Sequence, residues 1–243
     1  MKPRVLGFVP VYNEEHQIGE LMERSRFLLT DGVVDELMVI DDGSTDRTSN
    51  ILRSYPEYTI MRQPTNQGAG VAIRMAYRHA LEKGFDVFVL FAGNGKDSPA
   101  DVPKVLAPIL EGRADYVQGS RFLPGGERGG VPAHRLVSMK LFTLTYSLFL
   151  LRWYTDCTNG FRAYRTLILR DPRVNWSQTW LGNTYDMEYY LHYKVAQLGY
   201  RVTEVPVAKV YRPAPDGSYT KVRTIDWLTA LRPLFLLRLG IKQ

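Results

Sequence analysis

Residues 36–46 read Glu-Leu-Met-Val-Ile-Asp-Asp-Gly-Ser-Thr-Asp and carry a clear signal of local structure. Its apolar centre is typical of a buried strand, which ends in two carboxylates and a glycine. Ser44 or Thr45 can then cap a helix, which we expect to run to about Arg53. A buried strand followed at once by a capped helix is the repeating unit of a parallel α/β sheet.

The same alternation continues on both sides of this stretch. Further strands are expected at residues 5–11, 58–61, 86–91, 116–118 and 201–205. Helices are expected at residues 14–29, 68–83, 102–110, 136–154, 187–198 and 225–239. The glycine- and proline-rich residues 123–132 are expected to form a loop. The pattern predicts the α/β class, a Rossmann-like, mostly parallel sheet flanked by helices.

The composition is that of a globular protein with an excess of positive charge. The 243 residues carry a formal charge of +6, which suits a polyanionic partner such as a nucleotide diphosphate, a lipid phosphate or an anionic membrane. A solvated basic surface is the simpler explanation. The basic residues are scattered and form no basic arm, so we expect no nucleic-acid partner.

The sequence shows no pattern typical of a signal peptide or a membrane span. The first apolar run is short and is broken by Pro10, and no window approaches about 20 apolar residues. Cys157 is the only cysteine, which excludes an intrachain disulfide and favours a reducing compartment. We therefore expect a cytoplasmic protein, with the inner face of the membrane as a further place where it can lie.

Polar clusters follow three of the expected strands, at residues 13–14, 41–42 and 94–97. The carboxyl ends of parallel strands meet at one edge of a sheet, where the loops form the ligand crevice. These clusters are therefore expected to converge, which favours an enzyme over a structural module. The turn after the first strand lacks Gly-x-Gly-x-x-Gly, which argues against a nicotinamide dehydrogenase.

Two of these clusters belong to longer motifs that resemble a known family. Val9-Pro10-Val11-Tyr12-Asn13-Glu14-Glu15 and residues 39–46 are similar to the opening of the inverting family-2 glycosyltransferases with the GT-A fold. Further matches are Asn66-Gln67-Gly68, Gly119-Ser120-Arg121, and Asp156 followed by Asn159-Gly160-Phe161-Arg162. Over about residues 5–207, their order and spacing resemble the dolichol-phosphate mannose synthase and polyprenyl-phosphate glycosyltransferase group.

The resemblance implies a division of the chain. Residues 1–210 are expected to form the GT-A catalytic domain, with a nucleotide-binding half at about 1–120 and an acceptor half at about 121–210. A C-terminal basic loop and amphipathic helix are expected at 211–243.

The resemblance also implies which residues hold the nucleotide-sugar donor. Glu14 and Asp42 are expected to contact the nucleoside, and Pro10 and Tyr12 to shape the base pocket. Carboxylates accept strong hydrogen bonds from base and ribose, although Asp42 can also simply close the turn and cap the helix. Gly68 opens a helix whose N–H groups suit phosphate, and ordinary turn chemistry is the alternative.

The sequence departs from the family where an Asp-x-Asp motif normally holds a divalent cation. Ala92, Asn94 and Lys96 stand at the three corresponding places. Ala92 cannot bind a metal, and the ammonium of Lys96 would repel one. We hypothesise that Lys96 partly replaces the metal as the positive charge that faces the donor diphosphate. Two alternatives remain: a weakened Mg²⁺ or Mn²⁺ site formed by Asn94, Asp97 and Asp156, or a nucleotide-sugar-binding relative without turnover.

On the acceptor side the resemblance implies roles for Asp156 and Arg162. A polyprenyl phosphate is already anionic and needs little help from a base. A soluble hydroxyl acceptor would need a carboxylate base, for which Asp156 and Glu188 are candidates. The structural alternative for Asp156 is a cap or a salt bridge to Arg162. Arg212 and Lys221, in a segment that folds over the donor in similar enzymes, are expected to reach phosphate.

Residues 141–151 form an apolar run flanked by Lys140 and Arg152, with Trp153 next to it. Eleven helical residues extend only about 16 Å, too short for a hydrocarbon core of roughly 30 Å. The flanks suit a helix in the headgroup region, whereas a core helix or a dimer interface is the simpler explanation of the run. The sequence predicts an inverting transfer from a nucleotide-diphosphate sugar, with UDP slightly preferred over GDP, to a polyprenyl phosphate.

Overall fold

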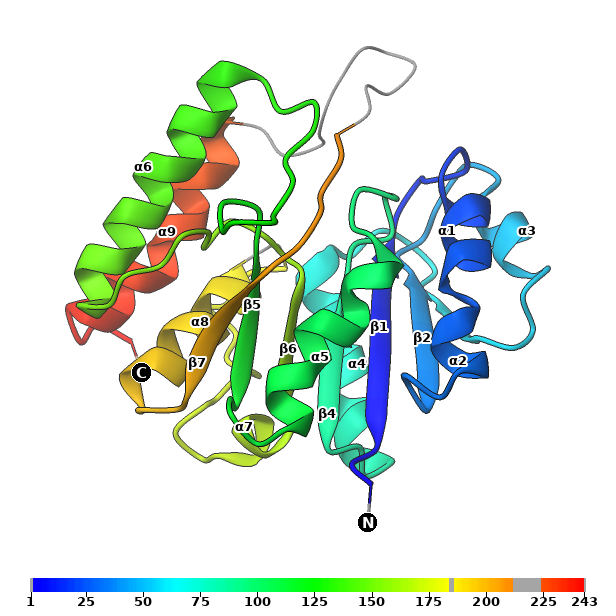
Figure 1. Ribbon diagram of the computed structural model, residues 1–243, viewed down its shortest axis with the longest axis horizontal. Helices are drawn as coiled ribbons and strands as arrows, with labels where there is room; N and C mark the ends of the chain where they lie inside the picture. Colours follow the sequence, from blue (N-terminus) through cyan, green and yellow to red (C-terminus); the bar gives the residue numbers. More distant parts are fainter. Residues whose placement is uncertain (1, 184–185, 212–223, 243) are drawn as a thin grey trace.

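The computed structural model describes residues 2–183, 186–211 and 224–242. Within these residues seven strands form one sheet, in the order β3-β2-β1-β4-β6-β5-β7 (Figure 1). The strands are β1 Val5–Val11, β2 Glu36–Asp41, β3 Thr59–Arg62, β4 Val87–Leu90, β5 Tyr116–Ser120, β6 Arg162–Arg165 and β7 Val202–Pro206.

Helices connect and cover these strands. They are α1 Ile18–Ser25, α2 Phe27–Thr30, α3 Thr48–Leu52, α4 Ala69–Glu82, α5 Val102–Leu110, α6 Ala133–Leu150, α7 Leu167–Arg170, α8 Asp186–Gln197 and α9 Thr224–Arg238, with a 3₁₀ turn at Pro99–Asp101. In the part of the chain that the structure describes, no helix combines the length and the apolar character needed to cross a membrane.

The sheet is mixed. β1 pairs in parallel with β2 and β4, β2 with β3, and β5 with β7, whereas β6 runs antiparallel between β4 and β5. The α/β class and the mostly parallel sheet are therefore confirmed. The sequence pattern did not predict β6 or α7. β6 reads Arg-Ala-Tyr-Arg and is largely buried in the sheet. Its two arginines break the apolar pattern by which a buried strand is predicted.

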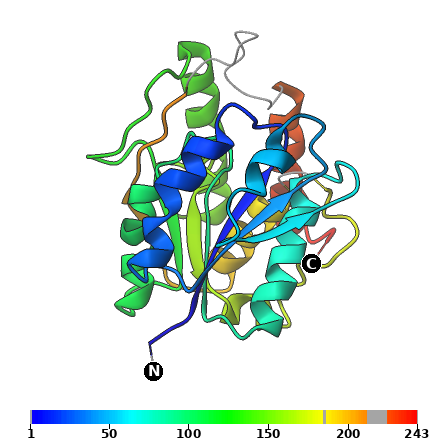
Figure 2. The same ribbon diagram turned by 90° about the vertical axis from the view of Figure 1, so that its right-hand side faces the viewer.

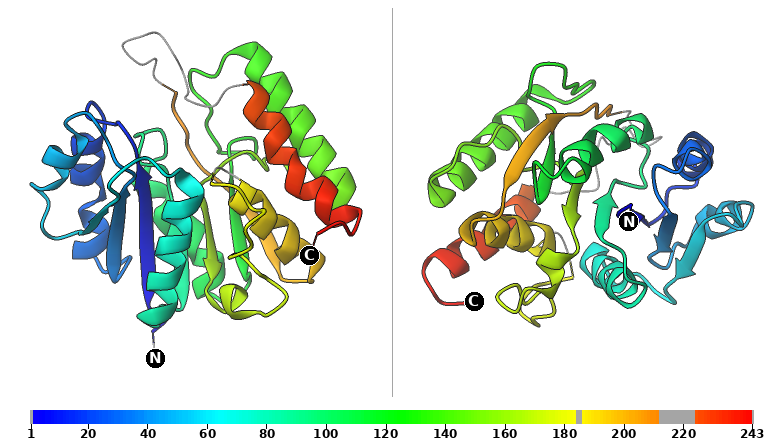
Figure 3. Two further views of the ribbon diagram at one scale, coloured as in Figure 1. Left: turned by 180° about the vertical axis from the view of Figure 1, so that it is seen from behind. Right: turned by 60° about the horizontal axis from the view of Figure 1, so that its bottom comes forward.

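Each face of the sheet carries its own core, because successive side chains of a strand point to opposite faces. In β1, Val5 and Val9 pack with α1 and α5, whereas Leu6 and Phe8 pack with α4, α6 and α8. Figure 2 shows helices on both sides of the sheet. Figure 3 shows α4 on the face opposite to α5, and α6 beside α9.

Several element ends differ from the expected ones for local reasons. The expected helix 14–29 starts later and is interrupted: residues 13–17 form a loop, α1 begins at Ile18, and α2 follows it from Phe27. α6 begins after Pro132 and ends where Leu151 takes a left-handed conformation, with φ 52°. The buried strand of the opening stretch is confirmed, but the expected cap is wrong. α3 begins only at Thr48, and its N-cap residue is Arg47, without a side-chain cap, rather than Ser44 or Thr45.

Candidate active site

The loops after β1 and β2 are joined by hydrogen bonds at the carboxyl edge of the sheet. The Asn13 N–H donates to Ser44 Oγ at 2.9 Å, and the Glu14 N–H donates to Thr48 Oγ1 at 2.8 Å. The Thr45 N–H donates back to Asn13 Oδ1 at 2.8 Å. Asn13 has φ 52°, a left-handed conformation that Asn tolerates better than most residues. The half-buried residues Tyr12 and Glu14 are thus held at this edge by backbone contacts.

The loop after β4 approaches the same edge. The Gly93 N–H donates to the Pro10 carbonyl at 3.2 Å. A Cβ at Gly93 would lie 2.6 Å from that oxygen, so the close approach needs glycine. The three polar loops expected to converge therefore do so.

Asp41 and Asp42 have different partners. Asp41 Oδ1 accepts the Ser44 N–H at 2.9 Å. Asp41 therefore closes the turn, a role that the sequence suggested as an alternative for Asp42. Asp42 is buried and accepts the N–H groups of Gln67 at 2.8 Å and Gly68 at 2.7 Å. Asp42 also accepts a hydrogen bond from Gln63 Nε2 at 2.6 Å. Asp42 therefore fixes the loop that leads into α4.

Gly68 enables a sharp turn before α4. Its φ is 93°, and a Cβ there would lie 2.2 Å from the Asn183 carbonyl oxygen. The Gly68 N–H is used by Asp42, and the Gly70 N–H donates to that same carbonyl at 2.9 Å. The structure thus gives Gly68 the turn role that we considered as the alternative to phosphate binding.

The loop after β4 holds the residues that replace the Asp-x-Asp motif. Asn94 Oδ1 accepts the Lys96 N–H at 3.2 Å, and Lys96 Nζ lies 5.2 Å from the ring centre of Tyr211. Asp97 is fully buried and forms an ion pair with Lys209 Nζ at 2.6 Å. Lys209 could not be predicted from the sequence, because its carboxylate partner is 112 residues away in the chain.

Asp156 is fully buried and pairs with Arg121, not with Arg162 as the structural alternative assumed. Arg121 Nε lies 2.7 Å from Asp156 Oδ2, and Nη2 lies 2.8 Å from Oδ1. Burial raises the pKa of Asp156, but the charge and hydrogen bonds of Arg121 outweigh it and hold the pKa below its usual value. Arg121 Nη1 also donates to the Tyr211 hydroxyl at 2.5 Å. Arg121 was visible in the Gly-Ser-Arg motif, but no role was assigned to it.

Arg162 lies on β6, buried within the protein. Its Nη1 donates to the Tyr116 hydroxyl and to the Glu188 carbonyl at 3.0 Å each, and its Nη2 donates to the Asn159 carbonyl at 2.7 Å. Its Nε lies 3.8 Å from Glu188 Oε1. Burial raises the pKa of Glu188, and the charges of Arg162 and Lys209 offset this only in part. Arg162 therefore positions Glu188 and the 156–162 loop.

The residues proposed for a divalent cation do not fit one. In the described residues no three His, Cys, Asp or Glu side chains group as a metal site would require. Asp97 and Asp156 are already paired with Lys209 and Arg121, and a cation beside each carboxylate opposes a metal. Asn94, Asp97 and Asp156 are thus unsuited to hold Mg²⁺ or Mn²⁺ in this arrangement.

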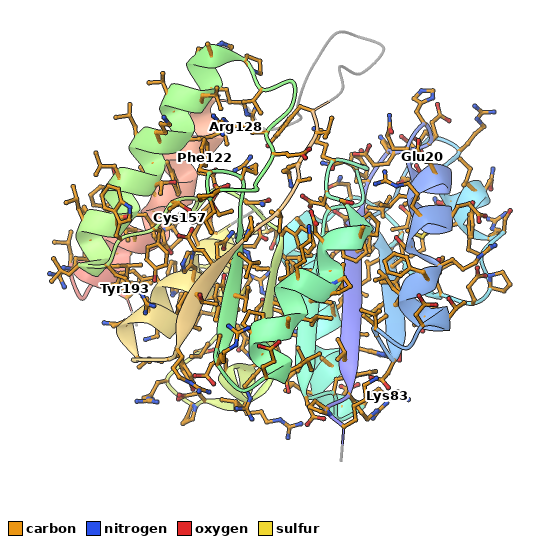
Figure 4. The ribbon with its side chains drawn as sticks, viewed as in Figure 1. Glu20, Lys83, Phe122, Arg128, Cys157 and Tyr193 are labelled. Carbon is orange, nitrogen blue, oxygen red and sulfur yellow. The ribbon has the colours of Figure 1, made fainter. Side chains whose placement is uncertain are left out.

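Several side chains between β5 and β6 were not among the sequence-predicted site residues. Phe122 and Arg128 are on the segment between β5 and α6, with the Arg128 guanidinium 5.2 Å from the Phe122 ring centre (Figure 4). Cys157 is a buried free cysteine, and burial raises the pKa of its thiol. Arg212 and Lys221 lie outside the described residues.

Comparison with known proteins identifies the family. The family model "Glycosyl transferase family 2" matches residues 8–171. An undecaprenyl-phosphate mannosyltransferase of Micrococcus luteus is 30% identical over 213 residues, which cover 86% of this chain and 84% of the relative. A polyprenol monophosphomannose synthase of Mycolicibacterium smegmatis is 29% identical over 210 residues, covering 84% of this chain and 76% of the relative.

A solved structure shares the fold. Glucosyl-3-phosphoglycerate synthase from Mycobacterium tuberculosis, in a complex with Mn²⁺, UDP and glucosyl-3-phosphoglycerate, superposes with a TM-score of 0.67 at 22% identity. The match covers 99% of this chain and 81% of that one. The expected GT-A fold is confirmed. The chain belongs to glycosyl transferase family 2 and is a glycosyltransferase.

Proposed function

We propose that this glycosyltransferase moves a sugar, with inversion, from a nucleotide-diphosphate sugar to a polyprenyl phosphate. A phosphate oxygen of the acceptor attacks the anomeric carbon, the bond to the donor diphosphate breaks, and the nucleoside diphosphate leaves. The observation that carries the proposal is the convergence of the loops after β1, β2 and β4 at one edge of the sheet. The relatives named for undecaprenyl-phosphate and polyprenol substrates support the acceptor class.

The donor is proposed to lie across this edge, with Glu14 and Asp42 at the nucleoside and Pro10 and Tyr12 at the base. Asp42 fixes the 63–68 loop through its hydrogen bonds, so it would shape the nucleoside site as well as contact it. We prefer UDP slightly over GDP as the donor nucleotide. The complex of the M. tuberculosis synthase with UDP supports this preference at the level of the shared fold.

Lys96 is proposed to supply positive charge toward the donor diphosphate. It lies in the loop after β4, at the edge where the donor is proposed to bind, and its ammonium faces the ring of Tyr211. A fixed cation near the leaving diphosphate stabilises the charge that develops there during transfer. Arg212 and Lys221 are proposed to add charge from the C-terminal segment.

The acceptor is proposed to approach the 156–162 loop. Asp156 is a poor candidate for a general base, because it is fully buried and its pKa is held low by Arg121. A phosphate acceptor needs no such base. Glu188, whose pKa is raised by burial, is the remaining carboxylate for the alternative of a hydroxyl acceptor.

We also propose that the protein works at an anionic membrane surface. α6 packs one face on the core, through side chains such as Phe142 and Tyr146, as the core-helix alternative expected. Its other face exposes apolar side chains at helical spacing. These side chains are Val137, Leu141, Leu144 and Leu148, and Leu151 and Trp153 continue the exposed surface. Lys140 and Arg152 are exposed beside this α6 stripe, an arrangement that suits anionic headgroups.

The test is product formation from UDP- and GDP-sugars with two acceptors. One is a short-chain polyprenyl phosphate, and the other is the corresponding polyprenol, which has the same chain but a hydroxyl end. We expect transfer to the phosphate only, at a rate that depends little on Glu188→Gln beyond its effect on stability. Transfer to the hydroxyl that is lost in Glu188→Gln would favour the hydroxyl-acceptor alternative. Nucleotide binding without transfer to either would indicate a relative without turnover.

A further inference from the structure

The ion pair between Lys209 and Asp97 is almost completely removed from solvent. The Lys209 side chain is 10% exposed and the Asp97 side chain 0%, and Lys209 Nζ lies 2.6 Å from Asp97 Oδ1. Nζ also donates to Asn159 Oδ1 at 3.1 Å. A buried ammonium with two defined acceptors is a fixed charge rather than a mobile surface group.

Asp97 lies in the loop where the family resemblance implied metal-binding carboxylates, and Lys209 lies in the segment after β7. Asp97 Oδ2 accepts the Ala92 N–H at 2.8 Å, so the carboxylate also fixes the start of the loop. The Val210 N–H donates to the Lys96 carbonyl at 3.0 Å, next to an isolated bridge between Asp97 and Lys209. The loop is therefore fastened to the segment after β7 at Lys96 and Asp97.

The charges around the loop are balanced by the protein itself. Three buried carboxylates, Asp97, Asp156 and Glu188, face three buried cations, Lys209, Arg121 and Arg162. Divalent cations bind through several oxygen ligands, usually with carboxylates that carry uncompensated negative charge. Here the ammonium of Lys209 already lies against the Asp97 carboxylate, and it would repel a second positive ion.

We propose that Lys209 is a built-in cation that neutralises Asp97 and excludes a divalent metal from this site, so that donor binding requires none. Only the second part of this proposal, donor binding without a metal, rests on the proposed function. Metal exclusion is a property of the protein alone. Lys209 acts through Asp97 and the loop and is a positioning residue.

The first experiment titrates Mn²⁺ alone into the full chain by calorimetry. We expect Lys209→Met to bind Mn²⁺ at least about tenfold more tightly than the wild type, because Asp97 loses its ammonium. Lys209→Met/Asp97→Asn should return to the wild-type level, since no carboxylate is left. The matched control is Lys104→Met. It removes an ammonium–carboxylate contact of the same length, 2.6 Å to Asp101, but from a lysine whose side chain is 61% exposed. That variant should behave as the wild type.

Equal Mn²⁺ affinity of Lys209→Met and the wild type would overturn the proposal. If Lys209→Met does not fold, Lys209→Gln, which keeps a hydrogen-bond donor, replaces it with the same expectation. The second experiment titrates UDP and GDP in excess EDTA and in excess Mn²⁺. Equal wild-type affinity in both conditions supports the proposal, and binding only with Mn²⁺ overturns it. A wild type that binds neither nucleotide would contradict the proposed function, while the Mn²⁺ titrations would still decide the role of Lys209.

Discussion

Arg121 and Asp156 form a buried, two-pronged ion pair that joins the end of β5 to the loop before β6. The two residues are 35 positions apart and both are almost completely buried. Asp156 Oδ1 also accepts the Thr158 N–H at 3.1 Å, so the acidic group is enclosed by donors. The pair therefore fixes the loop that we propose to face the acceptor.

Replacing Asp156 by Asn should strongly destabilise the protein. The guanidinium of Arg121 would remain buried without a counter-charge, and breaking a buried pair in this way costs about 3–5 kcal/mol. The measurement is urea denaturation at neutral pH. The control is Glu111→Gln, which removes the partner of Arg113 in an exposed pair and should change the unfolding free energy little. Equal effects of the two substitutions would contradict the buried pairing.

Asp42→Asn should weaken nucleotide binding at least about tenfold, because hydrogen bonds to a charged acceptor contribute about 1.5–3 kcal/mol each. The amide NH₂ of Asn would replace one of the two carboxylate oxygens. It would face either the Gly68 N–H, or the Gln67 N–H and Gln63 Nε2, so the 63–68 loop would loosen. Calorimetric titration with UDP and GDP measures the change. Asp31→Asn, at an exposed position, should bind as the wild type. Unchanged affinity in Asp42→Asn would remove Asp42 from the nucleoside site.

The sequence pattern predicted elements whose residues are locally consistent. α5 has the predicted bounds, Val102–Leu110, because its apolar spacing and the proline near its start both favour a helix there. β6 could not be predicted in this way. Its arginines are polar by type, and only their partners in the fold, such as Tyr116 and Glu188 for Arg162, make them part of a core.

The candidate site shows the same division. The convergence of Glu14, Asp42 and the 94–97 loop follows from strand order, which a local pattern can reveal. The partners of the buried carboxylates cannot be predicted from such a local pattern. Lys209 and Asp97 meet because the segment after β7 lies beside the loop after β4, and no periodicity in either segment indicates this contact.

Gly68→Ala should be destabilising and should also reduce nucleotide binding. An added Cβ would lie 2.2 Å from the Asn183 carbonyl oxygen, and φ 93° is unfavourable for alanine. Thermal denaturation and nucleotide titration test the two effects. Gly84→Ala is the matched control, because φ there is also positive, at 69°, but nothing lies within 4 Å of the added Cβ. A larger loss of stability in Gly84→Ala than in Gly68→Ala would contradict the close contact.

Lowering the pH should remove the contribution that the Asp115 carboxylate makes to the stability of the folded protein. Hydrogen bonds from Arg201 outweigh burial and lower the pKa of Asp115 in the folded protein. Since the folded pKa lies below the unfolded value of about 3.9, this contribution is present above that value and is lost as the pH falls through the folded pKa. Urea denaturation of Arg201→Met from neutral pH downward should therefore show a deficit that shrinks toward acid. Arg113→Met, at an exposed pair, should show none, and a pH-independent deficit in Arg201→Met would exclude the linkage.

Leu141→Glu/Leu148→Glu should reduce binding to anionic lipid vesicles at least about tenfold, because burying a leucine side chain contributes about 1.5–3 kcal/mol. Both side chains are exposed on the α6 stripe, at 59% and 62%, so folding should be unaffected. Vesicle sedimentation with phosphatidylglycerol and with phosphatidylcholine measures the loss and its dependence on charge. The control is Leu167→Glu, at an exposed position on α7, which should bind vesicles as the wild type does. If the double variant instead bound vesicles normally and altered the molecular mass measured by light scattering, α6 would be a subunit interface and the membrane proposal would fail.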